Sequence, residues 1–226
     1  MKKAIAILFS LIMVLSLAAC GNSTGQAERS SVENDPVENG ADDTESTQSP
    51  EIQPEEAEVS EDQRNHILVA YFSATNTTKG VAEHIANGLN ADIYEIVPEE
   101  PYTDADLDYH DNNSRSTIEM NDPDARPAIS GSVENMEQYE VVFIGYPIWW
   151  GEAPRIVSTF VESYDFAGKT VVPFCTSGGS GVGSSAANLE QLTSGATWME
   201  GRRLNGSDSQ DTVMEWVNSL GLDLGE

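Results

Sequence analysis

The sequence predicts an α/β domain in which a parallel sheet is covered by helices on both faces. The first observation is a continuous apolar run, Ile67–Phe72, whose lack of polar alternation is typical of a strand buried on both sides. The second is the helical spacing of the apolar residues from Val81 to Leu89. The third is that strand and helix patterns go on alternating along the chain, as they do in parallel sheets wrapped by helices.

The other elements are predicted in chain order by the same two kinds of pattern. Short apolar or alternating runs predict four more strands, at Asp92–Val97, Val141–Tyr146, Thr170–Thr176 and Ala196–Arg203. Apolar stripes predict further helices in Ala153–Ser163, Val182–Leu192 and Asp211–Leu220. The long polar connection Pro98–Ser130 is predicted to hold one helix near Asp104–Met120.

The first 20 residues have the pattern of a targeting segment. A basic start, Met1–Lys3, precedes the apolar run Ala4–Ala19, which is short for a membrane span but suits a signal peptide. The ending Leu17–Gly21 resembles the lipobox of bacterial lipoproteins, in which the cysteine is lipidated and becomes the first mature residue. The alternative is an ordinary secretory signal with an incidental cysteine. We expect a lipid on Cys20 to anchor the protein to the bacterial cell membrane, outside the cytoplasm.

The composition of the next segment differs from that of the rest of the chain. Residues 21–65 are polar and acidic with few large apolar side chains, so we expect a disordered tether. The whole chain has 11 Lys and Arg against 38 Asp and Glu, a formal charge of −27, which argues against nucleic acid as a partner. We therefore expect a lipoprotein signal peptide in residues 1–20, the tether in 21–65 and one folded domain in 66–226.

A first loop, Ser73–Thr78, carries four hydroxyl groups between a strand and a helix. Unpaired N–H groups and partial positive charge at a helix N-terminus favour a phosphate, and the hydroxyls would add donors. The alternative is a cluster of helix caps, for which one or two hydroxyls would suffice. A Walker loop is excluded because no Gly-Lys-Ser/Thr is present.

Two more loops follow predicted strands, and ligands of parallel sheets bind beyond the carboxyl ends of the strands. The second loop, Pro147–Gly151, contains Trp149 and Trp150 and predicts a wall on which a flat ring stacks. The alternative is that one tryptophan belongs to the core and the other covers a helix. The third loop, Thr176–Gly183, is rich in glycine, which lets the backbone approach a ligand closely. A loop that is merely flexible is the alternative.

Together the three loops resemble those of the flavodoxin family, and the resemblance spans His66 to about Leu222. The phosphate loop of that family is often Thr/Ser-x-Thr-Gly-x-Thr, and here Asn76 stands where glycine is usual. Asparagine adopts a left-handed backbone more readily than most residues, so the departure is mild. The resemblance implies a flavodoxin-like three-layer sandwich around a five-stranded parallel sheet of order 2-1-3-4-5.

The resemblance also implies FMN as the cofactor, bound by residues of all three loops. Trp149 is the expected stacking residue, because its Pro-x-Trp position matches the family. The expected cofactor-binding residues are Ser73, Ala74, Thr75, Asn76, Thr77, Thr78, Pro147, Ile148, Trp149, Trp150, Gly151, Thr176, Ser177, Gly178, Gly179 and Gly181.

The expected function is electron transfer by bound FMN, with a redox partner protein or a small electron acceptor. An alternative is an FMN-dependent NAD(P)H or quinone oxidoreductase, whose substrate pocket the connection Pro98–Ser130 would cover. A third alternative is a binding lipoprotein without redox use. We expect no dedicated acid, base or nucleophile, and the three histidines lack the spacing of a metal site. Cys175 lacks the Cys-x5-Arg pattern of phosphatases, since Gly181 stands at the arginine position.

Overall fold

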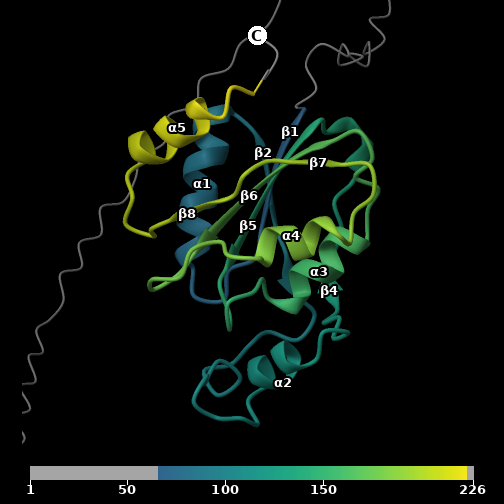
Figure 1. The fold of residues 1–226 in the computed structure, drawn as a ribbon, viewed down its shortest axis with the longest axis vertical. Helices are drawn as coiled ribbons and strands as arrows, with labels where there is room; N and C mark the ends of the chain where they lie inside the picture. Colours follow the sequence, from purple (N-terminus) through teal and green to yellow (C-terminus); the bar gives the residue numbers. More distant parts are fainter. Residues whose placement is uncertain (1–65, 223–226) are drawn as a thin grey trace, which may run out of the picture. The chain divides into compact units, whose positions relative to one another are not determined.

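The computed structural model describes residues 66–222, which form a three-layer α/β/α sandwich (Figure 1). The predicted signal peptide with Cys20 and the predicted tether lie outside the described residues, as do residues 223–226. Within residues 66–222, no helix combines the length and the apolar character needed to cross a membrane.

A parallel sheet of six strands forms the middle layer of the described domain. Its strands are β1 (Ile67–Tyr71), β2 (Asp92–Glu95), β5 (Val141–Pro147), β6 (Thr170–Thr176), β7 (Thr197–Trp198) and β8 (Arg202–Leu204). The order is β2-β1-β5-β6-β7, and β8 also pairs with β6. The predicted order 2-1-3-4-5 is therefore confirmed, with β7 and β8 together in the fifth position.

Two helices cover each face of the sheet (Figure 1). The helices are α1 (Thr77–Leu89) and α5 (Gln210–Ser219) on one face, and α3 (Arg155–Glu162) and α4 (Ser185–Glu190) on the other. Successive side chains of a strand point to opposite faces, so Leu68 packs in the α3/α4 layer and Val69 in the α1/α5 layer. All five residues of β1 are buried for this reason, as the apolar run predicts.

The fifth strand differs from the prediction, because the predicted strand Ala196–Arg203 is interrupted after Trp198. β7 pairs with the start of β6, at Thr170 and Val171, and β8 pairs with its end, from Phe174 onward. The interruption lies opposite Pro173, which has no N–H to donate to an edge strand. A proline in the neighbouring strand thus accounts for the split.

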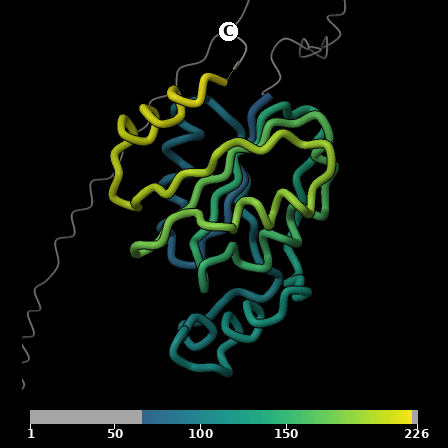
Figure 2. The backbone as a smooth tube through the Cα atoms, in the orientation of Figure 1, coloured from purple at the N-terminus to yellow at the C-terminus, as the bar shows by residue number. Residues whose placement is uncertain are grey.

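The connection between β2 and β5 contains the antiparallel pair β3 (Val97–Pro98) and β4 (Ile129–Ser130), helix α2 (Arg115–Asn121) and a 3₁₀ turn at Met136–Gln138. The part of it that contains α2 forms a lobe below the sheet, as Figure 1 and the tube in Figure 2 show. The predicted second strand therefore ends early, at Glu95, and Val97 belongs to a different sheet.

The helix predicted near Asp104–Met120 is wrong over its first part, because α2 begins only at Arg115. Local carboxylates accept the backbone N–H groups that a helix would need. The Thr103 amide donates to Asp106 over 2.8 Å and the His110 amide to Asp108 over 2.9 Å. Such bonds compete with helix formation.

Candidate functional site

The three loops lie beyond the carboxyl ends of β1, β5 and β6, which are neighbours in the sheet. Backbone bonds join them, because the Phe72 amide donates to Gly145 O and the Ile148 amide to Thr176 O, each over 2.9 Å. The buried hydroxyls of Thr78 and Thr176 also hydrogen-bond, over 2.9 Å. The structure therefore brings the starts of all three loops together, as the strand order predicts.

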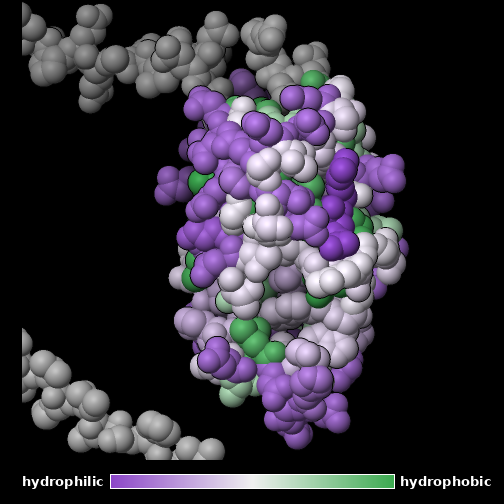
Figure 3. Space-filling view, turned by 90° about the vertical axis from the view of Figure 1, so that its left-hand side faces the viewer, coloured by the Kyte–Doolittle hydropathy of each residue, from purple (hydrophilic) through white to green (hydrophobic). Residues whose placement is uncertain are grey.

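A cavity of about 420 Å³ opens at this end of the sheet. Figure 3 shows a hollow between the body of the domain and the lobe that contains α2. The first two loops and the long connection line the cavity with Ser73, Ala74, Thr75, Thr78, Leu107, Tyr109, Ser116, Pro147, Ile148, Trp149 and Trp150. None of these lining side chains carries a charge, so the walls are aromatic, aliphatic and hydroxyl groups.

The first loop presents unpaired donors to the cavity. Asn76 is the N-cap of α1 with φ 62°, the left-handed backbone that the glycine of the resembled motif would adopt, and it makes no side-chain capping bond. The Ser73 hydroxyl is buried without a hydrogen-bond partner within residues 66–222. The alternative reading of the loop as a cluster of helix caps finds no capping bond here. Hydroxyls and helix amides without partners suit an anion.

The four hydroxyls of this loop are not equivalent. Ser73, Thr75 and Thr78 line the cavity, whereas Thr77 does not. Thr77 is exposed, with its hydroxyl 3.3 Å from that of Thr75 and its methyl packed close to Gly206. Thr78 is 1% exposed and its hydroxyl bonds to Thr176, so it also ties the first loop to the third.

The second loop places its two tryptophans in different environments. The Trp149 amide donates to Glu152 O and the Glu152 amide donates back to Trp149 O, each over 2.9 Å. Both central residues of this tight turn have positive φ, 48° at Trp150 and 84° at Gly151, as in a type I′ turn. A left-handed backbone is rare for so bulky a residue, and such outliers gather at ligand sites. The turn leaves Trp150 47% exposed at the cavity.

Trp149 is half-buried in an aromatic cluster. Its ring meets the ring of Phe72 edge-on at 5.5 Å between centroids and that of Tyr102 at 5.4 Å. Trp149 thus packs against the core, as the alternative interpretation of the pair predicts, but it also lines the cavity. Trp150 lines the cavity as well, as the interpretation of the pair as a wall for a flat ring predicts.

No residue of the third loop lines the cavity, and the loop reaches the cavity wall only through the hydrogen bond of Thr176 to the lining residue Thr78. Thr176 is buried and bonded to Thr78, but Ser177, Gly178, Gly179 and Gly181 are not among the lining residues. The loop closes on itself, because Ser177 Oγ accepts from the Gly179 amide over 3.2 Å and donates to Ser180 O. A role of Thr176 and of these four residues in holding a ligand stays a prediction.

A further wall of the cavity comes from residues of the long connection that no sequence motif indicates. Leu107, Tyr109 and Ser116 line the cavity, and Tyr109 is 68% exposed. Under the oxidoreductase alternative the connection Pro98–Ser130 covers the site, but the sequence pattern singles out no residue within it. The signal in the sequence that could have pointed to this wall is an aromatic residue, Tyr109, within a polar segment.

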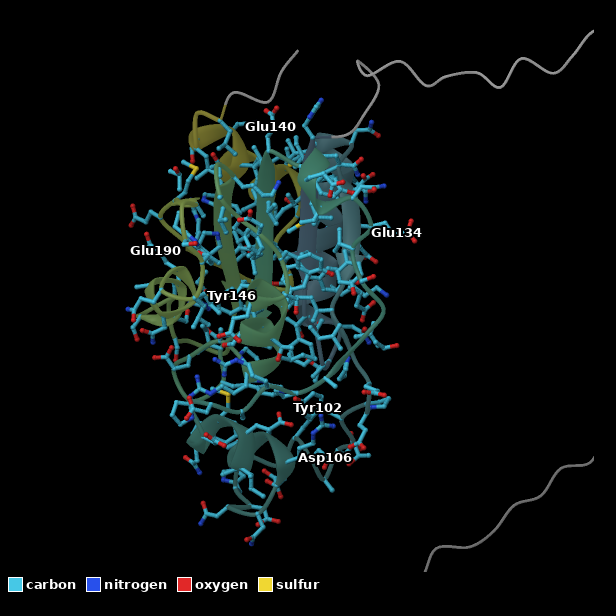
Figure 4. The ribbon with its side chains drawn as sticks, turned by 90° about the vertical axis from the view of Figure 1, so that its right-hand side faces the viewer. Tyr102, Asp106, Glu134, Glu140, Tyr146 and Glu190 are labelled. Carbon is cyan, nitrogen blue, oxygen red and sulfur yellow. The ribbon has the colours of Figure 1, made fainter. Side chains whose placement is uncertain are left out.

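A polar and aromatic cluster fixes this connection to the second loop. In Figure 4, Tyr102 and Asp106 lie in the lower lobe, below Tyr146 at the end of the sheet. The Arg115 guanidinium lies 4.2 Å from the centre of the Tyr102 ring, and its Nε donates to Glu119 over 2.6 Å. The Tyr102 hydroxyl donates to the same carboxylate over 2.5 Å. Burial and this bond raise the pKa of Tyr102, which stays protonated at neutral pH.

Cys175 does not belong to the site. It is fully buried in the layer of α3 and α4, and burial raises the pKa of its thiol to about 11. A protonated, buried thiol is a poor nucleophile, so its position indicates a packing role.

Comparison with known proteins gives the family of this fold and site. The family model for flavodoxin matches residues 66–220. The chain belongs to the flavodoxin family. Similar solved structures include candidate flavoproteins from Bacteroides eggerthii, at 49% identity, and Bacteroides uniformis, at 47%. The first match covers 71% of this chain and 100% of that one with a TM-score of 0.66, and the second 68% and 98% with 0.65.

A more distant solved structure shows the same fold. A flavoprotein from Lactobacillus acidophilus, solved in complex with FMN, is 20% identical over 70% of this chain and 100% of its own, with a TM-score of 0.53. A comparison with curated proteins found no match.

Proposed function

We propose that this flavodoxin-family protein binds FMN in the cavity and transfers electrons. The observation that carries the proposal is an uncharged cavity of about 420 Å³ with unpaired hydroxyl and helix donors at one wall and two tryptophans at another. A ligand that fits both walls has an anionic end and a flat ring. FMN has this form, and the Lactobacillus acidophilus flavoprotein of the same fold was solved with it.

The chain's own residues would hold the two ends separately. Ser73, Thr75 and the first amides of α1 would donate to the phosphate, and no lysine or arginine lines the cavity to share that role. Trp150 and Trp149 would contact the ring, with Leu107 and Tyr109 excluding water from its other side. Bound FMN would supply the electron-carrying ring, while the protein supplies binding, orientation and electrostatics.

The second candidate function is an FMN-dependent oxidoreductase acting on a nicotinamide or a quinone. The observation that favours it is the wall formed by Leu107, Tyr109 and Ser116, because a covered cavity suits a small substrate better than a docking protein. The third candidate, a binding lipoprotein without redox use, predicts that FMN binds but never changes oxidation state with any partner.

One experiment separates the three candidates. The purified protein is loaded with FMN and divided into two samples. The oxidised sample is mixed with NADH or NADPH, and the sample whose flavin has been reduced with dithionite is mixed with a quinone or with a one-electron acceptor protein such as oxidised cytochrome c, while the absorbance is followed. Electron transfer to the acceptor protein without direct oxidation of a nicotinamide supports the carrier. Rapid nicotinamide oxidation supports the oxidoreductase, and the absence of FMN binding contradicts all three.

We further propose that the protein is anchored to the bacterial membrane, outside the cytoplasm, by a lipid on Cys20. The basis is the sequence Leu17–Gly21 behind a short apolar run. Cys20→Ala should leave unlipidated protein, either as unprocessed precursor or released from the membrane. Mass spectrometry of the wild-type mature protein tests this, and an unmodified terminus at another residue would refute it.

A further inference from the structure

A second cavity, of about 300 Å³, shares no lining residue with the first. It lies where α3, α4 and the end of the long connection meet, and α3 and α4 lie side by side in Figure 1. The residues that matter here are Arg126, Glu152, Arg155, Ser158 and Asn188. Neither the flavodoxin resemblance nor the proposed function uses this cavity.

Arg155, the first residue of α3, has donors without partners. Its Nε is buried and makes no hydrogen bond within residues 66–222, and its one bond there runs from Nη2 to Met120 O over 3.1 Å. No carboxylate of the described residues lies within 4 Å of its guanidinium. An arginine has five N–H donors, and a buried donor without an acceptor is costly.

Ser158 adds a second donor on the same side of the helix. It follows Arg155 by three residues, a spacing that places two side chains on one helix face. Ser158 is 5% exposed and lines the cavity, and its hydroxyl makes no hydrogen bond within the described part of the chain. Both residues belong to the first turn of α3, where the helix dipole is positive.

The other charged groups at this cavity are already paired. Arg126 donates from Nε and Nη2 to the Glu162 carboxylate over 2.5 and 2.9 Å. The two Glu152 oxygens accept from Ser184 Oγ and Asn188 Nδ2, each over 2.8 Å. The groups at this cavity that are left without a hydrogen-bond partner in residues 66–222 are therefore the Arg155 Nε–H and the Ser158 hydroxyl. The nearby Glu152 carboxylate would repel a ligand with more than one negative charge.

We propose that this cavity binds a small carboxylate, with Arg155 and Ser158 as its donors. Two oxygens and a single negative charge match one guanidinium Nε–H, one hydroxyl and a helix N-terminus. A phosphate carries more charge at neutral pH, so the Glu152 carboxylate in the same wall disfavours it. This site is independent of FMN, and its test does not require flavin chemistry.

The test uses the full chain loaded with FMN, titrated with sodium acetate, sodium propionate or sodium phosphate at constant ionic strength. Binding is measured by calorimetry and by the ¹H–¹⁵N resonance of the Arg155 Nε–H. We expect saturable carboxylate binding that shifts this resonance, and weaker binding of phosphate. If a water molecule is the native partner of Arg155 Nε, none of the three anions will shift this resonance in a saturable way. That result would overturn the proposal.

Variants locate the binding. Arg155→Lys keeps the charge but removes Nε–H, and should weaken carboxylate binding about tenfold or more, the loss of one charge-assisted bond. Ser158→Ala should weaken it by a smaller factor and tests the site even if the arginine variant misfolds. The exposed Arg202→Lys is the matched control and should bind as wild type does. Equal binding by all four proteins would refute the assignment.

Discussion

The first loop, Ser73–Thr78, and the third loop, Thr176–Gly183, follow buried strands of one sheet but differ in how they are held. The first loop runs directly into the 13-residue helix α1, which fixes its backbone and aims its donors into the cavity. The third loop leads into the six-residue helix α4 and closes on itself through Ser177. The difference teaches that position after a buried strand does not by itself make a loop part of the cavity wall, because the third loop satisfies its polar groups within itself and the first does not.

The largest expected effect is on cofactor affinity, and it should be confined to the first loop. Ser73→Ala removes a hydroxyl with no protein partner, so we expect FMN binding to weaken by about 1.5–3 kcal/mol, the contribution of one hydrogen bond to a charged group. Ser180→Ala is the matched control in the third loop, because its exposed side chain lies outside the cavity wall. Fluorescence titration with FMN measures both, and equal losses would break the distinction between the loops.

The second prediction concerns the bond between side chains that joins the two loops in the described part of the chain. Thr78→Val or Thr176→Val leaves the other hydroxyl buried without its partner, so each should destabilise the fold by about 1–3 kcal/mol. The double variant should cost less than the two single costs combined, since no orphaned hydroxyl remains. Urea unfolding of the four proteins gives the coupling. Strict additivity would show that the bond does not link the loops.

The strands and their order could be predicted because local patterns set them. A strand that helices cover on both faces, such as β1, has a continuous apolar sequence. The predicted strand order of the sheet is confirmed. The break between β7 and β8 depends on Pro173 in a neighbouring strand, so the pattern of Ala196–Arg203 alone does not reveal it. The position of α2 depends on the aspartates that precede it, which take the backbone amides of their own segment.

The cavity could be predicted only in part, for the same reason. The residues of the first two loops follow their strands directly, so sheet order is enough to bring them together. Tyr109 reaches the cavity because the contacts of Tyr102 with Phe72 and Trp149 fix the connection in place. Such long-range contacts leave no periodic signal in the sequence, and neither does the turn away from the cavity within the third loop.

A smaller effect on stability should distinguish the first loop, where Asn76 has a left-handed backbone, from the third loop, where Gly179 does not. Asn76→Ala should destabilise the fold by about 1 kcal/mol, because a left-handed backbone is costly for a residue with Cβ, whereas Asn76→Gly should be neutral or stabilising. Gly179 has no positive φ and open space around it, so Gly179→Ala should change stability by less than about 0.5 kcal/mol. Urea unfolding checks all three. Equal costs at Asn76 and Gly179 would contradict this reading of the loops.

The most direct test of the central claim compares the binding of FMN and riboflavin, which differ by the phosphate. The apo protein is titrated with each flavin, and the quenching of flavin fluorescence gives the two dissociation constants. Two or more bonds from the first loop to the phosphate, each about 1.5–3 kcal/mol, predict that riboflavin binds roughly a hundredfold or more weakly than FMN. Equal affinity for the two flavins would contradict the assignment of the first loop as the phosphate site.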